Sequence, residues 1–99
     1  MSNPASKAAE RAVVVFTSYR GVFWGYATDT DGDTIALRSA RNCYSWPADN
    51  KGFLGLAAVG PLPGAKVGPR ADITLRSITC VALCTPEATN RWEAATWSD

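Results

Sequence analysis

The chain of 99 residues contains no histidine. Histidine is the commonest general base near neutral pH and a frequent metal ligand, so its absence excludes Ser-His-Asp catalysis, Cys-His catalysis and histidine metal sites. The nine acidic residues cluster mainly in one turn and at expected helix ends, where local structure already explains them. We therefore expect a protein that is not an enzyme and that has no metal site and no cofactor.

Cysteine pairs of the CxxC type are also missing. The three cysteines are Cys43, Cys80 and Cys84, an odd number without the spacing of zinc or thiol-redox sites. On one extended strand, Cys80 and Cys84 would point to the same face about 13 Å apart, which is too far for a disulfide. We expect buried, reduced thiols that line the core of a cytoplasmic protein.

Long apolar runs and an excess of one charge are absent as well. No run approaches the roughly 20 residues of a membrane-spanning helix, and the polar start Met1 to Arg11 lacks the apolar stretch of a signal peptide. Ten basic residues balance nine acidic ones, which leaves a net charge of +1. This balance argues against a membrane protein and against a nonspecific binder of duplex nucleic acid.

Aromatic residues, in contrast, are abundant: four Trp, three Tyr and three Phe. A chain of this length forms one domain, which we place at residues 12–97 after a flexible lead of residues 1–11. Not all of these rings can lie at the centre of so small a core, so some are expected to face a partner or ligand. Self-association would bury further apolar surface, and we expect a homo-oligomer.

The first half of the chain reads as a β-meander. Val13 to Thr17 has the β-branched residues of a strand buried on both faces or at a tight interface. A second strand, Val22 to Thr28, places Val22, Trp24 and Tyr26 on one face. Its glycine at position 25 predicts a bulge or a place where another backbone or side chain comes close. After an Asp-Gly hairpin turn at 31–32, a third strand runs from Thr34 towards Trp46 with a kink near Arg41-Asn42.

The second half mixes strand, loop and helix. Lys51 to Gly60 predicts one or two helical turns, and the prolines and glycines of Pro61 to Pro69 exclude regular structure. Ala71 to Cys84 predicts a long strand with a bulge near Ser77. Thr85 starts a short helix that ends near residue 95. We predict a mostly β fold, a small β-barrel or β-sandwich with a short crossover helix and a C-terminal helix.

Basic residues beside aromatic rings form the candidate binding site. Along a regular third strand, residues 38, 40, 42, 44 and 46 share one face, where guanidinium groups and rings can stack on bases or other planar anions. Alternatively, the rings are core or subunit-contact residues, and the arginines cover them with their stems. The Pro/Gly loop is not a P-loop but can place cations over an anion. The candidate ligand-binding residues are Arg20, Trp24, Arg41, Tyr44, Trp46, Lys66 and Arg70.

Several stretches carry a resemblance to a known family. They are RGVFWG at 20–25, ARNCYSW at 40–46, GFLGLAAVGP at 52–61, ITL at 73–75 and CTPEA at 84–88. Together, over about residues 12–95, they resemble a small uncharacterised family of tailed bacteriophages and prophages that is known as a domain of unknown function. The resemblance brings no activity or ligand. It implies a virus-encoded protein that acts in the host bacterial cytoplasm or is built into the virion.

Three functions stay open at this point. The first is a non-enzymatic phage accessory protein, a homo-oligomeric binding module that sequesters a small anionic, nucleotide-like signal or a host protein in counter-defence. The second is a minor virion or assembly protein whose aromatic residues make protein contacts. The third is a single-stranded nucleic-acid binder, which the near-zero net charge disfavours.

Overall fold

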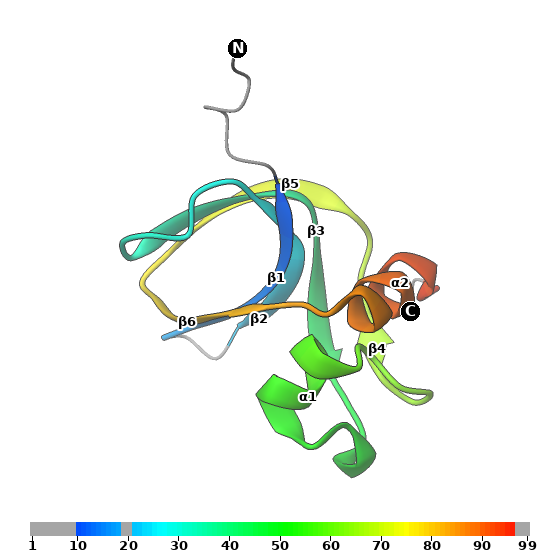
Figure 1. Cartoon of the computed structure of the whole chain (residues 1–99). Coiled ribbons are helices and arrows are strands. Elements are labelled where there is room, and N and C mark those ends of the chain that lie inside the picture. Colours follow the sequence, from blue (N-terminus) through cyan, green and yellow to red (C-terminus); the bar gives the residue numbers. More distant parts are fainter. Residues whose placement is uncertain (1–9, 19–20, 97–99) are drawn as a thin grey trace.

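The computed structural model describes residues 10–18 and 21–96, so most of the predicted lead, Arg20 and Trp97 lie outside the described residues. The elements, shown in Figure 1, are β1 Arg11–Thr17, β2 Val22–Ala27, β3 Thr34–Ser45, the short 3-10 helix η1 Ala48–Asn50, α1 Gly52–Ala58, β4 Lys66–Val67, β5 Ala71–Arg76, β6 Ile78–Leu83 and α2 Pro86–Ala94. The mostly β class with a short crossover helix and a C-terminal helix is confirmed. No helix of the described residues is long and apolar enough to cross a membrane.

The six strands form one antiparallel sheet that is not closed into a barrel. Its order is β4-β3-β2-β1-β6, and β5 pairs separately with β3. The long strand predicted over residues 71–84 is two strands, because Ser77 between them has a φ of 59°. β5 pairs with β3, and β6 pairs with β1. The corner at Ser77 therefore carries the chain from one side of the meander to the other (Figure 1).

Strand β1 lies at the centre of the molecule. Val13, Val14 and Val15 are all 0% exposed, which confirms the predicted strand with two buried faces. Successive side chains of a strand point to opposite faces. Val14 therefore belongs to the apolar cluster that includes residues of α1 and α2, whereas Val13 and Val15 belong to the cluster between the curled strands.

A bulge interrupts the pairing of β2 with β3. The register shifts between Trp24 and Tyr26, and Ser39 on the facing strand has a φ of 54°. A Cβ at Gly25 would lie 3.0 Å from the Cβ of Leu37, so this position needs glycine. The extra residue lies in β3, so the close approach by another strand predicted at Gly25 is confirmed, while the bulge or kink predicted near residues 41–42 lies at Ser39 instead.

This bulge changes the face that the second half of β3 presents. Before it, the odd residues Ile35 and Leu37 enter the cluster between the curled strands; after it, the even residue Ala40 does so. The odd residue Cys43 then joins the cluster of the helices. The prediction that the even-numbered residues from 38 to 46 all share one face is therefore wrong.

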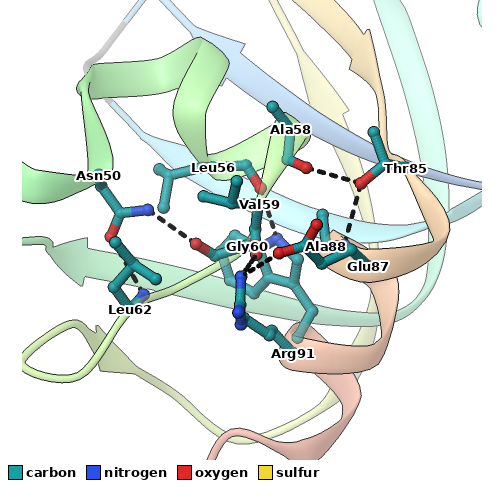
Figure 2. Close-up of polar contacts among 11 residues, drawn as sticks. Asn50, Leu56, Ala58, Val59, Gly60, Leu62, Thr85, Glu87, Ala88 and Arg91 are labelled. Atoms are coloured by element: carbon teal, nitrogen blue, oxygen red, sulfur yellow. Dashed lines mark hydrogen bonds and ion pairs between the residues drawn. The ribbon is translucent and has the colours of Figure 1, made fainter.

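Polar contacts fix α1 against α2, as Figure 2 shows. Thr85 caps α2 as predicted, because its hydroxyl accepts from the Ala88 N–H at 3.0 Å, and it also donates to the Ala58 carbonyl at 2.7 Å. Asn50, with 0% exposure, donates to the Gly60 carbonyl at 2.7 Å and accepts from the Leu62 N–H at 3.1 Å. These bonds satisfy buried backbone groups where the chain leaves α1 and where it enters α2.

Three smaller expectations are wrong. The Pro/Gly loop contains regular structure, since β4 pairs with residues Cys43 and Ser45 of β3. Cys80 is exposed rather than part of the core, because it lies on the edge strand β6, whereas Cys43 is buried and Cys84 is partly buried. The flexible lead was placed at residues 1–11, but β1 already includes Arg11.

Candidate ligand-binding site

Two of the predicted site residues lie inside the protein. Trp24 is 0% exposed and stacks on Trp92 of α2, with ring centroids 5.8 Å apart and an interplanar angle of 4°. Arg41, 4% exposed, donates from Nε to the Gly68 carbonyl at 2.9 Å and from Nη1 to the Trp92 and Ala95 carbonyls at 2.8 Å each. Its charge therefore satisfies carbonyls at the negative end of α2, and no face of either side chain is left for a ligand.

Arg70 joins this group from the chain segment before β5. Its guanidinium lies 5.9 Å from the centroid of the Trp24 ring. It also forms an ion pair with the Glu93 carboxylate at 2.8 Å and donates to the Glu93 carbonyl at 2.9 Å. The structure thus brings Trp24, Arg41 and Arg70 together, although it uses them to hold the last turn of α2.

The other predicted residues lie elsewhere. Tyr44 is 54% exposed, and its hydroxyl covers Gly68, where a Cβ would come within 2.6 Å of it. Lys66 is exposed opposite Ser45, and Trp46 packs half-buried against the cluster of the helices. The ligand-binding role predicted for Tyr44, Trp46 and Lys66 stays a prediction, and Arg20 lies outside the described residues.

Tyr26, which the sequence interpretation did not select, lies between two hollows. One hollow of about 450 Å³ is lined by residues of β2, β3 and β5 and by Glu10 and Thr28. The other, of about 380 Å³, lies where β1 and β6 meet the start of α2. The second is lined by Arg11, Ala12, Tyr26, Leu83, Cys84, Pro86, Thr89 and Asn90, and we call it the Tyr26 hollow.

Contacts on several sides hold the Tyr26 ring in place. Its hydroxyl donates to the Glu93 carboxylate, and the Arg38 guanidinium lies 4.7 Å from the ring centroid. The edge contact with Trp24 has a centroid distance of 5.1 Å. Burial, followed by the bond to Glu93, raises the pKa of Tyr26 to about 12. Tyr26 therefore presents a fixed, neutral ring to the hollow at neutral pH.

Cys84 is among the residues that line the Tyr26 hollow. Burial raises the pKa of Cys84 to about 12, although the Trp24 indole N–H is turned towards its sulfur and favours the thiolate. This approach falls short of a hydrogen bond, since the buried Trp24 Nε1 has no partner among the described residues. Because the thiolate is the nucleophilic form, the thiol is unreactive at neutral pH.

The remaining lining of the Tyr26 hollow suits a ligand with one polar end. Its exposed lining surface is predominantly apolar, with Ala12, Leu83 and Pro86 beside the tyrosine ring. Among the described residues, neither the Arg11 guanidinium nor the Asn90 amide has a hydrogen-bond or ion-pair partner. An apolar hollow with a few convergent polar groups is typical of a ligand-binding site.

Sequence reasoning missed this site because its parts come from distant segments. Tyr26 read as one of three alternating residues of β2, and Arg11 read as the end of a flexible lead. The residues that complete the hollow, Leu83 to Asn90, meet them only because β6 pairs with β1. One local signal was present: Tyr26 and Trp24 have the same parity on β2, so both face the helices.

The chain belongs to the family described as a domain of unknown function, DUF6948, whose match covers residues 10–92. No curated protein and no solved structure matches the chain. The family match includes every lining residue of the Tyr26 hollow but brings no activity with it. The setting in a bacteriophage stays a prediction.

Proposed function

We propose that this protein is a non-enzymatic binding module that holds a small, nucleotide-like anion in the Tyr26 hollow. The observation that carries the proposal is the combination of an apolar wall with two polar side chains, Arg11 and Asn90, that have no partner among the described residues. The guanidinium suits a phosphate, the amide suits the polar edge of a base, and the volume of about 380 Å³ suits one small ligand.

The titratable groups of the hollow support binding rather than chemistry. Tyr26 and Cys84, whose pKa values are both raised to about 12, keep their protons at neutral pH, so neither serves as base or nucleophile. No group of three or more potential metal ligands occurs among the described residues. Sequestration of a signal in the cytoplasm of a bacterium, as part of a viral counter-defence, is the biological role that we propose for it.

Calorimetry against cyclic oligonucleotides and nucleotide sugars tests this proposal. We expect Arg11→Ala and Asn90→Ala each to weaken binding about tenfold or more, because each removes a hydrogen bond to a charged or polar ligand group. Lys66→Ala, on the surface beside Tyr44, serves as the matched control and should bind like the wild type. Absence of binding, or loss of binding in the Lys66 variant alone, contradicts the assignment to the Tyr26 hollow.

A second candidate function, that of a minor virion or assembly protein, is favoured by Leu54. This residue of α1 is 71% exposed, which suits a contact with another protein. Mass spectrometry of purified virions distinguishes the two functions, since an assembly protein is present there in stoichiometric amount. Absence from the virion removes this candidate.

A further inference from the structure

Beside α1 lies a second apolar hollow, which shares no lining residue with the Tyr26 hollow. It has a volume of about 430 Å³, and its apolar lining consists chiefly of Leu54, Ala58, Val59 and Leu62. Figure 2 shows the last three where α1 turns towards α2. The hollow is therefore an additional feature of the surface, independent of the proposed ligand site.

The walls of this hollow are held by the fold. Nη1 of Arg91 donates to the Val59 carbonyl at 2.8 Å and pairs with the Glu87 carboxylate at 2.7 Å. Asn50 fixes the backbone at Gly60 and Leu62 from the other side. A surface whose backbone is already fixed loses little conformational entropy when a partner binds.

Leu54 projects at the margin of the same hollow. The apolar helix that carries it, Gly52–Ala58, contains no charged residue, in keeping with the depletion of charge at interface centres. A side chain that protrudes beside an apolar hollow is self-complementary under a twofold rotation. Leu54 of each copy then enters the hollow of the other, which is an isologous contact.

The charged residues of the hollow point to the same partner. Asp49 and Lys51 carry opposite charges, and neither has an ion-pair partner among the described residues. Under a twofold rotation each can face the opposite charge of the second copy. A partner with an excess of one charge would instead leave either Asp49 or Lys51 next to a like charge.

We infer that the hollow beside α1 is the interface through which two copies of this chain form a symmetric dimer. The dimer places Leu54 in the hollow of the second copy and pairs Asp49 with Lys51 across the interface. This inference does not depend on the proposed ligand, because the two hollows have separate linings.

Sedimentation velocity and light scattering of the full chain, over a micromolar concentration series, test the dimer. Leu54→Glu should raise the dissociation constant on the order of 100-fold or more, because two apolar side chains lose their burial at once. Ile73→Glu is the matched control, since this apolar residue of β5 is also exposed, at 36%, but lines neither this hollow nor the Tyr26 hollow. We expect it to leave the dimer intact.

A charge exchange keeps the test independent of folding. Asp49→Lys alone and Lys51→Asp alone should each weaken the dimer, since each places like charges opposite one another. The double variant restores opposite charges and should restore the dimer. A monomeric wild type, a dimer that Ile73→Glu dissociates and Leu54→Glu does not, or a double variant no better than the single ones would overturn the inference.

Discussion

Replacement of Arg41 by methionine tests how the sheet holds α2. The side chain is buried, and it donates to three backbone carbonyls, those of Gly68, Trp92 and Ala95, at 2.8–2.9 Å. Methionine fills a similar volume but has no donor. The last turn of α2 would then lose both its hydrogen bonds and the positive charge that faces its dipole.

The expected loss of stability in Arg41→Met is the difference between the lost hydrogen bonds and the relieved cost of burying a charge. Hydrogen bonds from a charged donor contribute about 1.5–3 kcal/mol each, and the cost of burying a guanidinium offsets part of this sum. We expect a net loss of about 3 kcal/mol in the free energy of unfolding, which corresponds to a melting temperature lower by about 12–24 °C in a domain of this size. Arg41→Lys should recover only part, because an ammonium lacks the planar fork that reaches several acceptors.

The assay is urea and thermal unfolding followed by tryptophan fluorescence, since the Trp24–Trp92 stack reports on the same contact. Arg38→Met is the matched control: this arginine lies on the same strand, but its side chain is 54% exposed and its partner is Glu10. We expect no resolvable change in stability for the control. Equal melting temperatures for the Arg41 and Arg38 variants would refute the reasoning.

Four further predictions concern glycine, tryptophan, thiol and alkaline behaviour. Gly60→Ala should lower the urea midpoint more than Gly32→Ala does. Both residues have positive φ, but of the two only Gly60 would bring a Cβ against another atom, the Ala88 carbonyl oxygen at 2.8 Å. Equal decreases of the urea midpoint would contradict this prediction. Trp92→Phe should be less stable than Trp24→Phe by about 1–2 kcal/mol, because only the Trp92 N–H has an acceptor, the Leu56 carbonyl; the reverse order in urea unfolding would argue against it. At pH 8 a disulfide reagent should modify exposed Cys80 rapidly, whereas buried Cys43 and partly buried Cys84, with pKa values raised to about 11 and 12, react slowly. Cys80→Ser should abolish the rapid phase, and three rapid thiols would disprove the assignment. The pKa of Cys84 is higher in the folded than in the unfolded chain, so its contribution to stability is complete below about pH 8.5 and is lost as the pH rises towards 12. Cys84→Ala should therefore reduce the fall in the free energy of unfolding, measured by urea titrations at alkaline pH. An unchanged dependence of this free energy on pH would contradict the prediction.

Local chemistry was enough to predict many of the elements. The β-branched run at Val13 to Val15 indicated a strand with two buried faces, because such residues suit a strand that water does not reach. Thr85 followed by proline indicated the start of α2, since the cap bonds and the φ of proline depend only on neighbouring residues. Gly25 likewise indicated the close approach of the facing strand, because a side chain at this position would collide with Leu37.

The sequence by itself therefore determined the mostly β class, the start of α2 and the common face of Trp24 and Tyr26 on β2. The tertiary structure alone decided which arginine is buried and where the hollows lie. The bulge at Ser39 shifts the faces of β3, so Arg41 faces α2, whereas a regular strand would place it on the same face as Ile35 and Leu37. The corner at Ser77, between β5 and β6, lets β6 pair with β1. This pairing forms the Tyr26 hollow from residues more than fifty positions apart. Pairings over such distances depend on the energy of the whole packed chain, for which no short stretch of sequence carries a signal.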